Sequence, residues 1–117
     1  MQPEERDLAY LWDMVEASRD VGEFIGGASF DQFANNKMLR YAVERRIEII
    51  GEAARHVSET FRARHPEIPW TQIIGQRNIL AHEYGEILLD RVWRTAKDSI
   101  PELEKLLNRL IDESKGK

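Results

Sequence analysis

The sequence contains no cysteine, which excludes disulfides, thiolate metal sites and cysteine nucleophiles and suits a reducing compartment. No apolar run approaches the roughly 18–20 residues of a membrane span. Residues 1–8 are acidic and polar, where a secretory signal would begin with basic residues and continue with apolar ones. We therefore expect a cytoplasmic protein that has no membrane partner.

An excess of basic charge is also missing. Lysine and arginine number 17 against 21 acidic residues, giving a net charge of -4. The protein therefore cannot bind nucleic acid through a general positive charge, and any contact with RNA or DNA must be local. The chain has 117 residues, 42% of them hydrophobic, which is enough for one modest core. We assign residues 1–117 to a single domain.

Hydrophobic residues recur mostly every three or four positions, which is the period of helices. The expected helices span residues 4–25, 39–61, 70–84, and 88 or 90 to 110. After the glycines that end the first helix, Ser29 or Asp31 can cap the next one. Gly75 is expected to lower the stability of the third helix, because glycine has a low helix propensity. Gly85 can take the left-handed conformation that closes it.

Prolines divide the second half of the chain. Pro66 and Pro69 force a loop before the third helix, and Pro69 suits that helix's start. Ser99 and Glu102 flank Pro101 in the pattern of a capping box, so we expect a kink or a restart within the last helix. The fold class is all-α, an up-and-down bundle of four or five helices. Its core is expected to include the three tryptophans, Trp12, Trp70 and Trp93.

The densest cluster of functional side chains covers residues 77–84, Arg-Asn-Ile-Leu-Ala-His-Glu-Tyr. On a helix, Asn78 and His82 share one stripe, and Arg77 and Tyr84 share another. Arg77 and His82 would lie about 140° apart around the axis, so one straight helix would not aim both at one small ligand. This is a reason to expect a composite site across a two-fold dimer interface.

An arginine, a histidine and an amide can in principle cleave RNA without a metal. The ribose 2′-hydroxyl is the nucleophile, histidine moves protons, and arginine stabilises charge on the phosphate. DNA lacks that hydroxyl and would be spared. The alternative is structural, because an arginine and a histidine at a helix end more often cap carbonyls or pair with acids such as Glu83 and Glu86.

The spacing Arg77-Asn78, three residues, His82, one residue, Tyr84 resembles the R-N-x-x-x-H-x-Y motif of HepT-type toxins in the HEPN superfamily. The resemblance extends over nearly the whole chain. It includes, in the same order, Ile50-Gly51-Glu52-Ala53, Ile68-Pro69-Trp70, Val92-Trp93 and Pro101-Glu102-Leu103.

This resemblance implies a dimeric, metal-independent ribonuclease toxin with a HEPN-like fold. Arg77 and His82 would be its catalytic pair, and Asn78 would position His82 or the phosphate. The implied partners are RNA, a second copy of the chain and a nucleotidyltransferase antitoxin of the MntA type, which attaches AMP to Tyr84. This chain needs no cofactor, because ATP is used by the antitoxin. Adenylylation would block the cleft and repel RNA phosphates.

Glu44, Glu48, Glu52 and His56 are spaced by four along the second helix. Bundle di-iron proteins use such residues, but they need a matching Glu-x-x-His on another helix, and the sequence has none. We expect these carboxylates to be solvated or paired with nearby arginines, and no metal to be bound. Glu52 stands in the family-like segment, which makes it a candidate supporting residue for Arg77 or His82.

Local basic patches could hold an RNA strand, at Arg62, Arg64 and His65 and at Arg40, Arg45 and Arg46. Helix-end charges that complement the helix dipole explain Arg62 and Arg64 equally well. Two other functions stay open: a non-catalytic HEPN-like dimer that binds a nucleotide or a partner nucleotidyltransferase, and a structural dimer in which the motif caps a helix.

Overall fold

The structure is a computed structural model that describes the backbone of residues 3–80 and 85–115 and the side chains of residues 5–76 and 89–114. These residues are helical apart from short connections, and none of them forms a strand. The helices are α1 (Pro3–Ile25), α2 (Phe30–Ala34), α3 (Lys37–His56), α4 (Glu59–Arg64), α5 (Trp70–Leu80), α6 (Gly85–Arg94), the π-helical turn η1 (Thr95–Ser99) and α7 (Ile100–Lys115). The predicted all-α bundle is confirmed.

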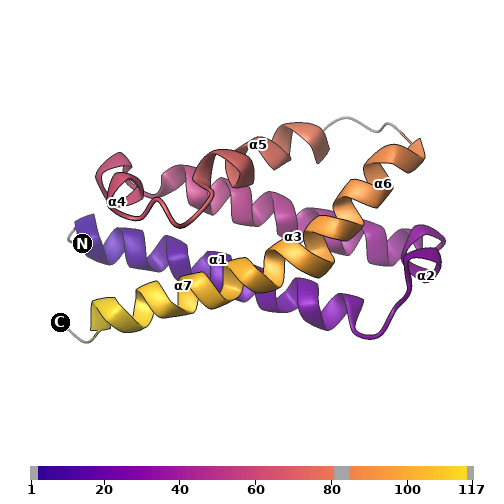
Figure 1. Cartoon of the computed structure of the whole chain (residues 1–117), viewed down its shortest axis with the longest axis horizontal. Helices are drawn as coiled ribbons and strands as arrows, with labels where there is room; N and C mark the ends of the chain where they lie inside the picture. Colours follow the sequence, from indigo (N-terminus) through magenta and orange to yellow (C-terminus); the bar gives the residue numbers. More distant parts are fainter. Residues whose placement is uncertain (1–2, 81–84, 116–117) are drawn as a thin grey trace.

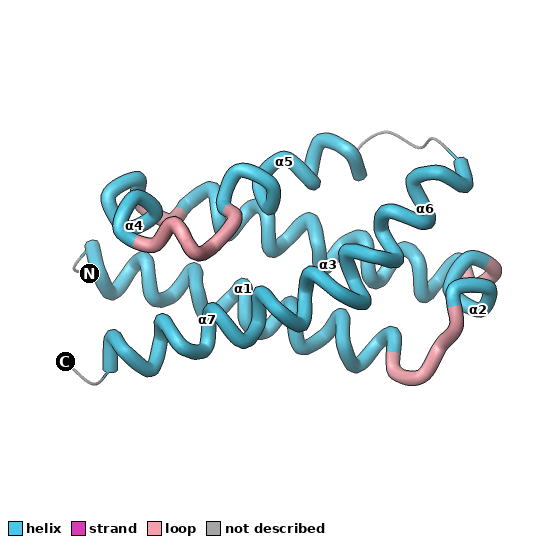
Figure 2. Tube along the Cα trace, in the orientation of Figure 1, coloured by secondary structure: helices cyan, strands magenta, loops and turns pink. Residues whose placement is uncertain are grey.

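The long helices run roughly along one axis of a body measuring 45 × 26 × 23 Å. Helix α1 packs against α3 and α7, and α5 packs on α3 (Figure 1). The short α2 lies at one end of the bundle and contacts α3 and α6. Figure 2 shows loops at the α1–α2 and α4–α5 connections, so most of the described chain is committed to helix.

The core is an apolar column shared by α1, α3 and α7, with Phe33 of α2 closing one end. Phe33 is fully buried, and its ring lies 5.3 Å from that of Trp93. Trp70 and Trp93 are buried as predicted, but Trp12 is 41% exposed, which corrects its assignment to the core. Leu11 and Val15 occupy the inward stripe of α1, and Trp12 is turned about 100° from Leu11 around the helix.

The expected single helix over residues 39–61 is interrupted. Helix α3 ends at His56, Val57 is extended with φ -66° and ψ 138°, and Ser58 caps the new helix α4. Asp7 of α1 explains the break, because its carboxylate accepts hydrogen bonds from both the Ser58 N–H and the Ser58 hydroxyl at 2.8 Å. A contact 51 residues away in sequence therefore overrides the apolar periodicity that favoured one long helix.

Gly85 begins α6, so the expectations that it closes the third helix and that the fourth begins at 88 or 90 are both wrong. A left-handed glycine occurs instead at Gly26, with φ 49°, directly after α1. Ser29 then caps α2 through a reciprocal capping box with Gln32, as the sequence predicts.

The last helical region is continuous from α6 through η1 to α7, so Ser99 does not cap a restarted helix. The expected disturbance takes the form of a π turn, in which the Ile100 N–H donates to the Thr95 carbonyl five residues back. Pro101 follows directly, and it has no N–H for the carbonyl of Lys97. Over residues 3–80 and 85–115, none of the helices combines the length and apolarity needed to cross a membrane.

Candidate functional site

Helix α5 carries the first half of the segment Arg77–Tyr84. The Pro69 carbonyl accepts the Ile73 N–H at 3.0 Å and so begins the helix, which confirms the place predicted for Pro69. Trp70 fixes that end, because its buried indole donates to the His65 carbonyl at 2.9 Å. Ile73 is 5% exposed and belongs to the core beneath α5. Arg77 is the one charged residue in the sequence of α5, so the helix brings local positive charge into an acidic chain.

The predicted site residues are placed only in part. Arg77 and Asn78 lie in the last turn of α5, which ends at Leu80. His82 and Tyr84 lie outside the described residues, as does the expected continuation of the helix to residue 84. Helix α6 begins at Gly85, so two described helices flank residues 81–84 directly. The pairing of Arg77 with His82, and the roles of Asn78 and Tyr84, stay predictions.

The two flanking helices are held by different parts of the bundle. Helix α5 packs on α3, whereas α6 packs on α2 and continues into η1. Figure 1 shows α5 and α6 as separate arms of the bundle. Described side chains of α3, α5 and α6 line the space between these arms.

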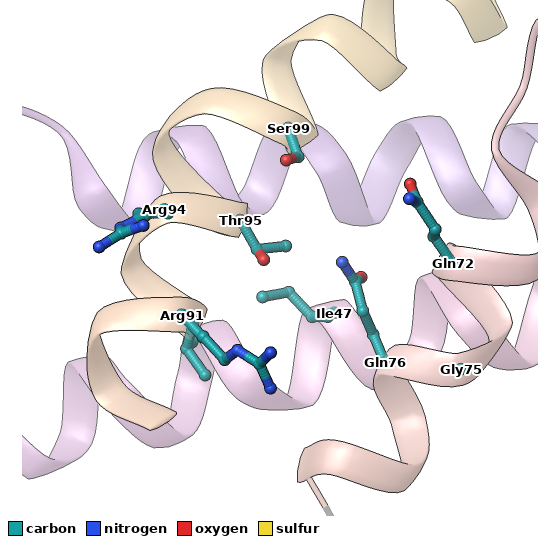
Figure 3. Close-up of a pocket in the computed structure, with 9 residues that line it drawn as sticks. Ile47, Gln72, Gly75, Gln76, Arg91, Arg94, Thr95 and Ser99 are labelled. Carbon is teal, nitrogen blue, oxygen red and sulfur yellow. The ribbon is translucent and has the colours of Figure 1, made fainter. Parts of the chain in front are cut away.

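A pocket of about 550 Å³ opens in this space. Its polar lining residues are Gln72 and Gln76 of α5, Arg91 and Arg94 of α6, and Thr95 and Ser99 of η1. Ile47 and Val92 supply apolar surface, and Gly75 forms part of the wall. Figure 3 shows the two glutamine amides and the Arg91 guanidinium extending into the space that Ile47 and Thr95 border, whereas Arg94 points away.

Sequence reasoning missed this pocket. Its signal is faint: two glutamines four residues apart, which share a helix face, with Gly75 between them. The opposite wall comes from Arg91 and Ser99, and their proximity to the glutamines depends on how α6 and η1 return across α3. Only the tertiary arrangement brings these residues together.

Glu52 lies on α3 in a second, smaller pocket between α1 and α3. Its carboxylate is 3.9 Å from the Arg45 guanidinium. In the same pocket, Tyr10 and His56 stack with ring centroids 5.3 Å apart. A supporting role of Glu52 toward Arg77 or His82 stays a prediction, because neither of those side chains is among the described ones.

Two carboxylates of the acidic series on α3 pair with an arginine of the same helix, as expected. Arg45 pairs with both Glu48 and Glu52. Among the side chains that the structure describes, no group of three or more histidine, aspartate or glutamate residues has the arrangement of a metal site. The series therefore gives no support to the di-iron alternative.

The basic patches are also partly paired. Arg46 lies 3.5 Å from Asp20, and Arg64 lies over the ring of Phe61 at 5.7 Å. His65 contacts Glu67 at 3.2 Å. The pKa of Glu67 is lowered mainly by a hydrogen bond from its own backbone N–H, and further by His65. Arg62 and Arg64 lie in the last turn of α4, which agrees with the helix-end explanation of these two charges.

Comparison with known proteins identifies one family over most of the chain. Residues 14–110 match the family described as Ribonuclease HepT-like, and this range includes all of residues 77–84. The chain is 44% identical over 101 residues to the Methanocaldococcus jannaschii protein named "Putative RNase MJ1380", covering 86% of this chain and 93% of that protein. It is 37% identical over 101 residues to "Probable ribonuclease HepT" of Thermococcus cleftensis, covering 86% and 92%.

A second Methanocaldococcus jannaschii protein, named "Putative RNase MJ1216", is 37% identical over 113 residues, covering 96% of this chain and 93% of that protein. No solved structure matches the chain. The family match covers residues 77–84, and the three relatives are matched over more than nine-tenths of their length. The chain belongs to the HepT-like ribonuclease family.

Proposed function

We propose that this protein is a metal-independent endoribonuclease that acts as the toxin of a toxin-antitoxin pair. The observation that carries the proposal is the family match over residues 14–110, because it spans the complete segment Arg77–Tyr84. Relatives that carry RNase names, matched over more than nine-tenths of their length, support the same activity. The substrate is RNA, held where the end of α5 meets the start of α6.

Cleavage uses the 2′-hydroxyl of the substrate. A base removes the hydroxyl proton, the 2′-oxygen forms a bond to phosphorus, and the bond from phosphorus to the 5′-oxygen breaks as that oxygen receives a proton. The products are a 2′,3′-cyclic phosphate and a free 5′-hydroxyl. His82 is the group that moves protons, because an imidazole titrates near pH 6.5. Arg77 stabilises the charge that develops on the phosphate.

The active form is a homodimer. His82 lies five positions after Arg77, so a continuous helix would direct the two side chains about 140° apart. A two-fold axis beside residues 77–84 brings the arginine of one protomer toward the histidine of its partner and completes two equivalent clefts. Asn78 supports the site by orienting His82 or the phosphate.

A nucleotidyltransferase antitoxin silences the enzyme by transferring AMP from ATP to Tyr84. The added phosphate places negative charge two residues from His82 and seven from Arg77, which opposes binding of an RNA phosphate. The adenosine group also adds bulk at the cleft. ATP serves the antitoxin as a substrate, and the ribonuclease itself works without a cofactor.

The test is cleavage of total cellular RNA by the purified protein in EDTA, with Arg77→Ala and His82→Ala beside the wild type. Only the wild type should cut, and its products should end in 2′,3′-cyclic phosphate. The chain offers a matched control in His56→Ala, since His56 is exposed and stacks on Tyr10 away from residues 77–84. That control should cut like the wild type.

Light scattering checks that every variant keeps the dimer mass, and circular dichroism checks its helix content. Equal cutting by His82→Ala would remove the catalytic assignment. A folded, unmodified wild-type dimer that cuts nothing would instead favour the non-catalytic dimer that binds a nucleotide or a partner nucleotidyltransferase.

A further inference from the structure

The pocket between α3, α5, α6 and η1 presents polar groups that have no partner among the side chains of residues 5–76 and 89–114. Gln72, Gln76 and Arg91 make no hydrogen bond or ion pair with any other side chain that the structure describes. Ser99 is likewise unpaired among the described residues. By contrast, Arg94 on the same turn of chain is paired with Asp90. Within the described part of the chain, the groups that face the pocket therefore keep their hydrogen-bonding capacity for a ligand.

The chemistry of the lining matches a nucleobase attached to a phosphate. Gln72 and Gln76 each offer an amide donor and acceptor, the combination that reads the edges of unpaired bases. Ile47 and Val92 provide apolar surface against which the face of a base can lie. Arg91 supplies a planar cation that can stack on a base or bind its phosphate. The volume, about 550 Å³, falls within the roughly 300–1,000 Å³ typical of small-molecule sites.

The charge of its lining distinguishes this pocket from the smaller pocket between α1 and α3. No carboxylate is among its described lining residues, although the chain as a whole is acidic. The pocket between α1 and α3 is lined by Asp13 and Glu52 as well as Arg55, so it would oppose a phosphate from two sides. Of the two, the α5–α6 pocket is the one that suits RNA.

Its position also suits RNA held at the end of α5. Gln76 directly precedes Arg77, and Gln72 lies about 7.5 Å before Arg77 along the helix axis. Ser99 and Thr95 belong to the π turn, a local widening that is frequent at functional sites. A strand that presents a phosphate to the last turn of α5 therefore has an adjacent base within reach of both amides.

We propose that this pocket is a subsite that holds one unstacked base of the RNA, next to the phosphate that is cleaved. The inference rests on the proposed ribonuclease function for its substrate. It adds Gln72 and Gln76 as residues that bind and select the base, and Arg91 as a contact to the neighbouring phosphate or the face of the base.

Gly75 provides a direct way to close the subsite. It lines the pocket, and a Cβ built there meets no atom within 4 Å. A leucine at this position starts from an open Cβ position on the pocket wall, and it would raise the helix propensity of α5. Gly22 is a matched control, because it is also a helical glycine with nothing within 4 Å of an added Cβ, and it lies on α1.

The experiment is NMR titration of the full chain with the four ribonucleoside 3′-monophosphates, and with inorganic phosphate as a separate probe. In the wild type and in Gly22→Leu, at least one nucleotide should give saturable shifts of the side-chain NH₂ signals of Gln72 and Gln76. Gly75→Leu should weaken that binding at least tenfold. Replacing both glutamines by alanine, which closes nothing, should weaken it by about tenfold or more, as loss of a specific amide–base contact does.

Several results would overturn the subsite. One is that nucleotides shift other signals but not those of Gln72 and Gln76. Another is that Gly75→Leu binds nucleotides as tightly as the wild type. A third is that inorganic phosphate alone gives the same shifts, which would mark a simple anion site. A Gly75→Leu protein that loses its dimer mass would show that a second copy of the chain fills the pocket. Nucleotide binding does not depend on cleavage, so a wild type that binds nucleotides here but cuts no RNA would refute the proposed function and leave the pocket as a nucleotide-binding site without a role in cleavage.

Discussion

We predict that Asp7 contributes more than any other polar side chain to holding the connection from α3 through α4 to α5 in its observed path. It is 5% exposed, and its two carboxylate oxygens accept from the N–H and the hydroxyl of Ser58. Ser58 in turn caps α4 by accepting the Phe61 N–H at 3.1 Å. Asp7→Ala removes both bonds at once and leaves the first turn of α4 unattached to α1.

The expected cost follows from the type of bond that is lost. A hydrogen bond to a charged group contributes about 1.5–3 kcal/mol, and the two bonds share one carboxylate, so we expect Asp7→Ala to lower the free energy of unfolding by about 2–3 kcal/mol. For a chain of this length, that loss corresponds to a fall in Tm of about 8–12 °C. Urea denaturation followed by circular dichroism gives the free energy directly.

Asp13→Ala is the matched control, because Asp13 lies on the same helix but is exposed. It should change stability by less than about 0.5 kcal/mol. A double-mutant cycle of Asp7→Ala with Ser58→Ala should show a positive coupling energy. If Asp7→Ala costs no more than Asp13→Ala, the explanation given for the break between α3 and α4 is refuted.

Further predictions concern single side chains. Gly22→Ala should raise the free energy of unfolding by about 0.5–1 kcal/mol, while Gly26→Ala should lower it by about 1–2 kcal/mol because φ is 49° there; urea titrations compare them. Phe33→Ala should cost about 3–5 kcal/mol and change the near-UV signal of Trp93, since the rings lie 5.3 Å apart; an unchanged spectrum would contradict that contact. The lowered pKa of Glu67 adds stability above the unfolded value near pH 4.3 that is lost as the pH falls through the folded value, so Glu67→Gln should flatten the acid limb of a Tm–pH profile.

Local sequence signals predicted much of the fold. The first helix was expected over residues 4–25 and is Pro3–Ile25, and Ser29 caps the next helix. These features depend on neighbours within a few positions. The break at Ser58 could not be predicted in this way, because it depends on a carboxylate of α1 that reaches it only in the folded bundle.

The candidate site likewise has a part that local sequence signals predicted and a part that they could not predict. The spacing of Arg77, His82 and Tyr84 is local and led directly to the family that the comparisons confirm. The pocket formed by Gln72 and Ser99 is non-local, since its walls come from α3, α5, α6 and η1. The π turn could be predicted only in part. Pro101 indicated that the last helix would be disturbed, but the sequence did not show that the helix would widen and continue instead of restarting.

The separate anchoring of α5 and α6 has a consequence for how the molecule opens. Because α5 packs on α3 and α6 packs on α2, either helix can lose its protection without requiring the other to unfold. Hydrogen exchange should therefore assign α5 and α6 to different cooperative units. Local unfolding of α6 would then leave the last turn of α5, which carries Arg77, folded on α3.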